Sequence, residues 1–208
     1  MRAALILAGG LSKRMGRPKQ FLDFYGVPLF ARISSRLADV VDEVVLSISK
    51  GDEPSRYRPH LPDFVLIVKD ELDVQAPLVG FCSGLKPIKS NYTFIVSCDA
   101  PFVNPKVVCE LFNRAEGGDA ALPRWPNGLV EPLHAVYHTS RALDAACRCV
   151  KANRFKNLTI LDYMQDVRYI DVEELRRLDQ NLLTFFNVNT FEDYKNALKA
   201  AAQANSLQ

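Results

Sequence analysis

Short apolar runs alternate along this chain with segments in which apolar residues recur every three or four positions, and this alternation restricts the fold more than any other feature. Short apolar runs are typical of buried strands, and the longer period is typical of amphipathic helices. The expected strands are Ala3–Leu7, Glu43–Ile48, Phe64–Val68, Tyr92–Val96, Ala120–Leu122, Leu133–Tyr137 and Val167–Ile170. The expected helices are Pro28–Val40, Pro77–Leu85, Pro105–Ala115, Ser140–Val150, Lys156–Met164, Val172–Leu178 and Phe191–Ala202.

Alternation of strands and helices predicts an α/β fold, with a Rossmann-like, doubly wound and mainly parallel sheet that carries helices on both faces. Ligands of such sheets bind beyond the carboxyl ends of the strands, where the strand order reverses. The 208 residues are enough for one well-buried domain, and no repeat or linker interrupts them. We therefore expect a single domain over residues 1–208, with fraying from about residue 204.

The first expected strand runs into a loop that is rich in glycine and positive charge. The segment reads Leu5-Ile6-Leu7-Ala8-Gly9-Gly10-Leu11-Ser12-Lys13-Arg14-Met15-Gly16-Arg17-Pro18-Lys19. Glycine lets the backbone approach a ligand closely, and successive loop N–H groups can converge on an anion. The spacing of Gly9, Gly10 and Gly16 matches neither G-x-G-x-x-G nor G-x-x-x-x-G-K-[ST]. The segment thus predicts a phosphate-binding loop of another kind, with an ordinary strand-to-helix turn as the alternative.

The composition favours a globular protein and argues against a general binder of nucleic acid. There are 26 basic and 24 acidic residues, for a net charge of +2, whereas such binders usually carry a basic excess. The five cysteines have no framework spacing, which indicates free thiols in a reducing compartment. The N-terminal apolar run is too short for a signal peptide, and no run approaches the ~18 residues of a membrane span. We expect a cytoplasmic protein with neither a membrane nor a nucleic acid as partner.

Two carboxylates, Asp70 and Asp99, each follow an apolar strand and would meet the loop at one edge of the sheet. Mg²⁺ prefers oxygen ligands and is usually held by one or two carboxylates together with substrate phosphates. An aspartate at a strand end is also an ordinary turn former, which is the alternative. Among the loop cations, Arg14 can place two donors on phosphate oxygens, whereas Lys19 acts as a point charge. This set suits phosphoryl chemistry, which needs mainly alignment and electrostatic stabilisation.

Five motifs, in order, resemble those of the nucleotidyltransferases related to molybdenum cofactor guanylyltransferase, the MobA-like family. Leu7–Lys19 resembles the family signature L-A-G-G-x-S-x-R-M-G-x-x-K. The later motifs are Asp70 with Ala76-Pro77-Leu78-Val79-Gly80, then Ser97-Cys98-Asp99-Ala100-Pro101-Phe102, Glu131-Pro132-Leu133, and Phe186-Asn187-Val188-Asn189-Thr190-Phe191-Glu192-Asp193. The chain departs from the family at Pro18, Ala76 and Phe191, where an acidic or amide residue, Gly and Pro are usual.

The resemblance implies Mg²⁺-dependent transfer of GMP from GTP to molybdopterin, which carries molybdenum, with release of pyrophosphate. It implies that Arg14, Lys19 and Asp99 are catalytic and that Asp99 holds the metal. The residues that it assigns to the nucleotide are Leu7, Ala8, Gly9, Gly10, Lys19, Asp70, Pro77, Gly80 and Asp99. Those that it assigns to the acceptor are Glu131, Asn187 and Asn189. It also implies transient contact with other molybdenum cofactor enzymes.

Three other functions stay open at this point. CTP with molybdopterin, or GTP with another phosphorylated acceptor such as cobinamide phosphate, would keep the fold and change a substrate. A regulator that binds a nucleotide without turnover would keep the fold and lack the enzymatic activity. Related cytidylyl-transferring enzymes tend to carry acidic residues where this chain has Asn187 and Asn189, and that difference favours guanylyl transfer.

Overall fold

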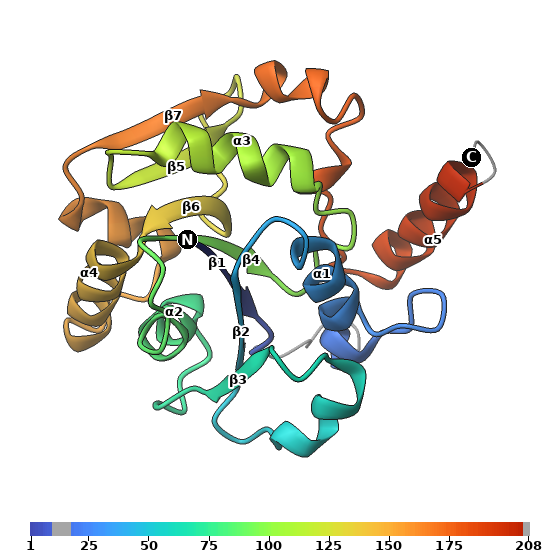
Figure 1. Cartoon of the computed structure of the whole chain (residues 1–208), viewed down its shortest axis with the longest axis horizontal. Coiled ribbons are helices and arrows are strands. Elements are labelled where there is room, and N and C mark those ends of the chain that lie inside the picture. The colour runs from blue at the N-terminus through green and yellow to red at the C-terminus, as the bar shows by residue number, and fades with distance from the viewer. Residues whose placement is uncertain (10–17, 206–208) are drawn as a thin grey trace.

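A seven-stranded sheet forms the centre of the computed structural model, which describes residues 1–9 and 18–205 (Figure 1). The strands are β1 (Arg2–Leu7), β2 (Glu43–Ile48), β3 (Leu66–Lys69), β4 (Tyr92–Ser97), β5 (Ala120–Arg124), β6 (His134–His138) and β7 (Val167–Asp171). Their order is β3-β2-β1-β4-β6-β5-β7. All neighbours pair in parallel except at β6, which is antiparallel to both β4 and β5. The predicted α/β fold with a mainly parallel sheet is confirmed.

Helices cover both faces of the sheet. The α-helices are α1 (Leu29–Leu37), α2 (Pro77–Leu85), α3 (Pro105–Ala115), α4 (Thr139–Lys151) and α5 (Phe191–Asn205). The 3-10 helices are η1 (Lys19–Phe21), η2 (Pro54–Arg56), η3 (Arg58–His60), η4 (Asn157–Tyr163), η5 (Val172–Arg177) and η6 (Leu183–Phe185). Helices α1 and α3 pack on one face, and α2 and α4 on the other (Figure 1). No helix in the described ranges is long and apolar enough to cross a membrane.

Two segments that the sequence predicts as helices are 3-10 helices in the structure. The Lys156–Met164 segment forms η4, where the Thr159 hydroxyl donates to the Lys156 carbonyl over 2.7 Å. Local hydroxyl–carbonyl bonds of this kind compete with α-helical pairing. The Val172–Leu178 segment forms η5, which begins where the Asp171 carboxylate accepts from the Glu173 N–H. Both segments are short, and i→i+3 bonding suits short pieces.

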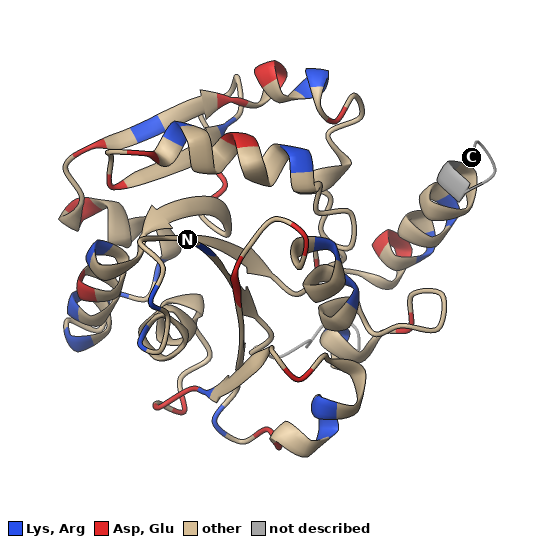
Figure 2. Cartoon of the chain, viewed as in Figure 1, with Lys and Arg blue, Asp and Glu red and all other residues tan. Residues whose placement is uncertain are grey.

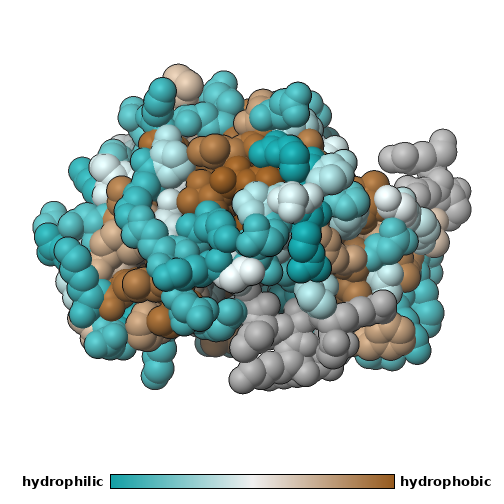
Figure 3. Space-filling model, turned by 90° about the horizontal axis from the view of Figure 1, so that it is seen from below, coloured by the Kyte–Doolittle hydropathy of each residue, from teal (hydrophilic) through white to brown (hydrophobic). Residues whose placement is uncertain are grey.

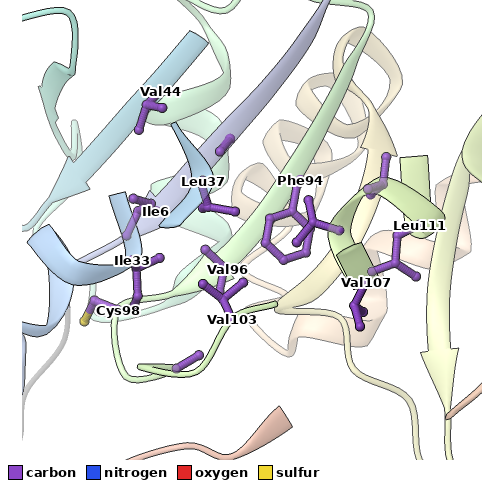
Figure 4. Packing of buried hydrophobic residues seen from close by; sticks show 14 of the residues in the cluster. Ile6, Ile33, Leu37, Val44, Phe94, Val96, Cys98, Val103, Val107 and Leu111 are labelled. Carbon is purple, nitrogen blue, oxygen red and sulfur yellow. The ribbon is translucent and has the colours of Figure 1, made fainter. Parts of the chain in front are cut away.

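The core has two layers because both faces of the sheet are buried. In β1, Ala4 and Ile6 point into the layer under α1 and α3, whereas Ala3 and Leu5 point into the layer under α2 and α4. Figure 4 shows the first layer: the Phe94 ring of β4 lies between side chains of α3 and of neighbouring strands. A strand buried on both faces reads as a continuous apolar run, which is why β1 was predicted within one residue.

The C-terminal helix α5 extends away from the sheet (Figure 1). It begins at a reciprocal cap, because the Asp193 N–H donates to the Thr190 hydroxyl while the Thr190 N–H donates to the Asp193 carboxylate. Ala197 and Ala201 bury one side of the helix in a third apolar cluster with Phe24. This cap fixes the chain just after Asn189.

Charged residues of both signs are mixed over the outer helices and loops (Figure 2). The space-filling view from below is mainly hydrophilic, with its largest hydrophobic area above the centre and smaller ones toward the left and right (Figure 3). Phe64 and Leu66, at the β3 edge of the sheet, are exposed. Few of the buried residues are charged, and a buried carboxylate or ammonium group needs a specific partner.

Gly84 of α2 lies directly on β1, and we expect Gly84→Ala to destabilise the protein. A Cβ at this position would lie 2.3 Å from Leu5 Cδ1. Overpacking of a dense core costs about 1–3 kcal/mol, and urea denaturation would measure this loss. Gly51→Ala is the matched control, since a Cβ there meets nothing within 4 Å. Equal stability of the two variants would contradict close packing of α2 on β1.

Candidate active site

The candidate site lies where the carboxyl ends of β1 and β4 meet. The Cys98 N–H donates to the Leu7 carbonyl over 3.0 Å, so Gly9 and Asp99 leave adjacent strands side by side. The strand order reverses between these two strands, which is where α/β sheets bind ligands. A cavity of about 630 Å³ opens there, lined by Gly9, Lys19, Gln75, Ala76, Pro77, Ser97, Asp99, Glu131, Pro132, Leu133, His134, Asn157, Phe185, Asn187 and Asn189.

The Lys19 ammonium contacts the Asp99 carboxylate at the floor of this cavity. Burial is the largest single influence and would lower the pKa of Lys19, but the Asp99 charge, the neighbouring Cys98 and the hydrogen bond to Asp99 together raise that pKa above its ordinary value. Lys19 is thus held in its charged form beside a carboxylate that is only 5% exposed. The pairing joins residues 80 positions apart and places a fixed cation at the switch point of the sheet.

Asp99 retains a free ligand atom. Its Oδ1 is buried and has no hydrogen-bond partner among residues 1–9 and 18–205. A buried carboxylate oxygen without a partner is costly, and a bound cation would satisfy it. No group of three His, Cys, Asp or Glu residues gathers in the described part of the chain. Asp99 therefore fits an ion such as Mg²⁺, which takes one or two carboxylates and completes its shell with phosphates and water.

The turn that begins with Lys19 is held by buried polar contacts. The Gln20 amide donates to the Tyr57 hydroxyl over 3.2 Å, and that hydroxyl donates to Asp52 over 2.7 Å. The Phe21 ring packs on Tyr57 with 4.7 Å between ring centroids. Burial, and then the bond to Asp52, raise the pKa of Tyr57 well above its ordinary value, so its hydroxyl stays protonated. The network fixes η1 and with it the backbone of Lys19.

The turn after Asp99 is held by two arginines of α1. Arg32 Nε donates to the Pro101 carbonyl over 3.0 Å, and Arg36 Nε donates to the Val103 carbonyl over 2.6 Å. On the other side, the Val188 N–H donates to the Asp99 carbonyl over 2.8 Å. Contacts from α1 and from the Val188 segment thus fix the backbone of the carboxylate that faces Lys19.

Asp70 ends β3 beside a smaller pocket that shares Gly9 and Pro77 with the main cavity. Its Oδ1 accepts a 2.6 Å hydrogen bond from the Ser47 hydroxyl. Burial raises the pKa of Asp70 to about 6, and the Asp52 charge adds to the increase while the Ser47 bond opposes it. A Cβ on Gly9 would lie 3.2 Å from Asp70 Oδ2, so glycine lets the β1 loop approach this carboxylate.

The far wall of the cavity comes from the segment before α5. Val188 is fully buried, while Asn187 and Asn189 line the cavity on either side of it. The Asn189 N–H donates to Asp193 over 3.1 Å, which ties the end of this segment to the α5 cap. Asn187 and Asn189 therefore lie on the same side of this segment, with both side chains at the cavity, because successive residues of an extended chain alternate in direction.

Glu131 and His134 lie on the wall next to β6. Trp125 Nε1 donates to Glu131 Oε1 over 2.7 Å. His134 Nε2 lies 3.0 Å from the Thr184 hydroxyl, and burial lowers the pKa of His134 to about 3. The imidazole is therefore neutral at pH 7. Because β6 is antiparallel to β4, the residues just before β6 reach the same edge of the sheet as those just after β4.

The described site gathers most of the residues that the sequence singled out. Lys19, Gly9, Pro77, Asp99, Glu131, Asn187 and Asn189 line the main cavity, and Leu7, Asp70 and Gly80 line the smaller pocket. Ala8 lines neither, because it is buried in the layer under α1 and its N–H donates to the Ser47 carbonyl. Gly10 and Arg14 lie outside the described residues.

Sequence reasoning missed three lining residues, Gln75, Asn157 and Phe185. Asn157 begins η4, which is far from every motif in sequence, and Phe185 ends η6, which lies just before the Phe186–Asp193 motif. Polar and aromatic residues in irregular segments carry no periodic signal. Only the position of Phe185 two residues before Asn187 could have pointed to it.

Known proteins resemble this chain along its whole length. Residues 4–161 match the model of the MobA-like NTP transferase domain. A probable molybdenum cofactor guanylyltransferase of Methanosarcina mazei is 37% identical, and the match covers 99% of this chain and 94% of that protein. A second relative of the same name, from Natronomonas pharaonis, is 34% identical over 94% of this chain and 96% of its own.

Solved structures give the same result for the fold. Molybdopterin-guanine dinucleotide biosynthesis protein A of Archaeoglobus fulgidus superposes with a TM-score of 0.82 at 26% identity, over 98% of this chain and 100% of that chain. A 2-C-methyl-D-erythritol 4-phosphate cytidylyltransferase of Thermus thermophilus superposes with a TM-score of 0.68 at 16% identity, covering 97% of this chain and 100% of its own. The second likeness concerns the fold alone.

The raised pKa of Asp70 predicts a specific pH dependence of stability. Its pKa is about 6 in the folded protein and ordinarily 3.8, so the folded state binds more protons between these values. The free energy of unfolding then falls as the pH rises from about 4 to about 6, by up to about 3 kcal/mol. Asp70→Asn removes this contribution, so its stability relative to the unaltered protein should increase over that range.

Urea denaturation at intervals between pH 4 and pH 7 would measure the effect. Asp63→Asn is the control, because Asp63 is an exposed carboxylate. Parallel stability curves for Asp70→Asn and the unaltered protein would contradict a protonated Asp70 in the folded state.

Proposed function

We propose that this chain, which belongs to the MobA-like NTP transferase family, transfers GMP from GTP to molybdopterin and releases pyrophosphate. The observation that carries the proposal is the buried Lys19–Asp99 pair at the floor of the cavity, with one Asp99 oxygen left for a cation. The names of the full-length relatives support GTP as donor and molybdopterin as acceptor.

The nucleotide half of the proposed site is the edge formed by the ends of β1, β3 and β4. Lys19 supplies a positive charge for the triphosphate, and Asp99 holds Mg²⁺. We assign Leu7, Gly9, Gly10, Asp70, Pro77 and Gly80 to nucleotide binding, the two loop glycines to the phosphates and Pro77 and Gly80 to the base or ribose, with Ala8 supporting the loop from the core. The two pockets share Gly9, Gln75, Ala76 and Pro77, which supports a single nucleotide site that extends over both.

In the reaction, a phosphate oxygen of the acceptor attacks the α-phosphorus of GTP in line, the new P–O bond forms, and the bond to the pyrophosphate oxygen breaks. Bound Mg²⁺ would neutralise negative charge on the triphosphate and the leaving pyrophosphate. Lys19 and Arg14 stabilise the charge that shifts to the leaving group. Alignment of two bound substrates supplies much of the rate enhancement, so no covalent intermediate on the protein is needed.

The acceptor half is the opposite wall, with Glu131, Asn187 and Asn189. Its position supports the proposal, because an acceptor bound there would direct its phosphate toward Asp99. The hydrogen bond from the Val188 N–H to the Asp99 carbonyl joins the backbone of this wall to the backbone of the nucleotide half. Guided by this arrangement, we expect the acceptor to bind productively only when its phosphate points to Lys19.

Turnover with defined substrates tests the reaction. Purified protein with Mg²⁺, GTP and molybdopterin should release pyrophosphate and form the guanine dinucleotide. CTP in place of GTP, or cobinamide phosphate in place of molybdopterin, should give turnover at least about tenfold slower. Faster turnover with either replacement would change the assigned substrate, and GTP binding without any turnover would identify a regulator.

Asp99→Asn should lower kcat at least about 100-fold, the effect typical of removing one electrostatic stabiliser of a transition state. The amide keeps the side-chain volume and loses the negative charge that holds a cation. The measurement is pyrophosphate release as a function of Mg²⁺ concentration. The control is Asp171→Asn, at the end of β7, where Asn caps η5 as well as Asp does. Unaltered kcat and Mg²⁺ dependence in Asp99→Asn would remove Asp99 from the metal site.

A further inference from the structure

Two carboxylates line the described part of the cavity, and their surroundings are opposite. Asp99 is paired with the Lys19 ammonium at the floor. Glu131, on the wall next to β6, makes no salt bridge with any Lys or Arg in the described ranges. The charge of Asp99 is therefore neutralised by a neighbouring cation, whereas the charge of Glu131 is not neutralised by any Lys or Arg in the described ranges.

The Glu131 carboxylate is held in place by neutral groups. Trp125 Nε1 donates to its Oε1 over 2.7 Å, and the Glu131 N–H donates to the Pro123 carbonyl over 3.0 Å. The Trp125 backbone is fixed in turn by the 2.7 Å bond from its N–H to the Leu129 carbonyl. An indole donor orients a carboxylate without cancelling its charge. Glu131 is thus pre-positioned as an acceptor for N–H donors of a ligand.

An aromatic surface lies beside this carboxylate. The Phe185 ring lines the cavity, and the rings of Trp125 and His134 pack against it edge-on, with centroids 5.7 Å and 5.1 Å away. His134 is buried and bonded to Thr184, so it cannot turn away. Phe185 is only 8% exposed, and the two neighbouring rings hold it in place, so the part of it that reaches the cavity is a small, fixed apolar contact for a ligand ring.

We propose that Glu131 and Phe185 form the subsite for the pterin ring of the acceptor. The inference rests on the proposed function, which makes the acceptor a pterin. A 2-amino-4-oxopteridine is flat and carries two neighbouring donors, the 2-amino group and N3–H. A carboxylate accepts such a pair of N–H donors in charge-assisted bonds, and Phe185 contacts the ring.

The charges also set the direction of the acceptor. The terminal phosphate is attracted by Lys19 and repelled by Glu131, whereas the neutral pterin edge meets no such repulsion. The pterin therefore lies at the β6 wall while the phosphate lies at the floor. Glu131 is then a binding and orienting residue for the acceptor and contributes nothing to nucleotide binding.

Two small pteridines test the subsite without turnover. Pterin itself has both donors, and 4-oxopteridine lacks the 2-amino group. Equilibrium binding, followed by pterin fluorescence in the presence of Mg²⁺ and GTP, should give at least about tenfold tighter binding of pterin by the unaltered chain. Equal affinity for the two compounds, or no binding of pterin, would overturn the proposal; this comparison needs no variant.

Glu131→Gln is the matching substitution, because its amide oxygen still accepts from Trp125 while the charge is lost. Pterin affinity should fall at least about tenfold, with 4-oxopteridine and GTP affinities within about twofold of the original. Glu116→Gln, at an exposed carboxylate beyond the other end of β5, is the control and should change none of them. Undiminished preference for pterin in Glu131→Gln would remove Glu131 from the subsite.

Steady-state kinetics separate this inference from the proposed reaction. Glu131→Gln should raise the KM for molybdopterin at least about tenfold and leave the KM for GTP unchanged. If the unaltered protein transfers GMP and the variant has the same KM for molybdopterin, the proposed reaction is supported and the proposed pterin subsite is contradicted. If pterin binding depends on Glu131 and no GMP is transferred to molybdopterin, the proposed pterin subsite is supported and the proposed reaction is contradicted.

Discussion

The parallel pairing of β1 with β4 is the constraint on which the rest of the site depends. It makes β1 a strand with neighbours on both sides and both faces buried, so only its carboxyl end is left to meet a ligand. It also sets Gly9 and Asp99 side by side, where the strand order reverses. The two-layer core fixes this pair of strands from both faces, which keeps the floor of the cavity rigid.

The charged pair and the neutral groups that line the cavity occupy different parts of it. The Lys19–Asp99 pair at the floor is internally compensated, and replacing the contact between them with Mg²⁺ and phosphate would keep both charges satisfied. The wall next to β6 carries Glu131, a neutral His134 and aromatic rings. This difference in charge between the floor and the wall suits two substrates that must approach in one relative orientation. An acceptor bound the other way round would bring its phosphate against the Glu131 carboxylate.

Much of this arrangement was predictable from local sequence. The buried strands could be predicted because their apolar runs are continuous, and Asp99 because it is a carboxylate that follows such a run within three residues. The Thr190 cap also has a local chemical signal, because Thr followed three residues later by Asp is typical of a helix N-terminus. The 3-10 helices at η4 and η6 were harder, because i→i+3 segments are short and their side chains follow no long period. The lining residues Asn157 and Phe185 lie in these segments and were missed accordingly.

The sequence by itself determined the strands and α-helices, the mainly parallel character of the sheet and the residues that follow β1 and β4. Those features follow from hydrophobic period and turn chemistry, which act over a few residues. Only the tertiary structure decided that β6 runs antiparallel between β4 and β5. That reversal brings Glu131 to the edge that Asp99 occupies, because the start of an antiparallel strand lies beside the ends of its parallel neighbours. Strand direction depends on long-range pairing, and no local pattern in residues 120–138 specifies it.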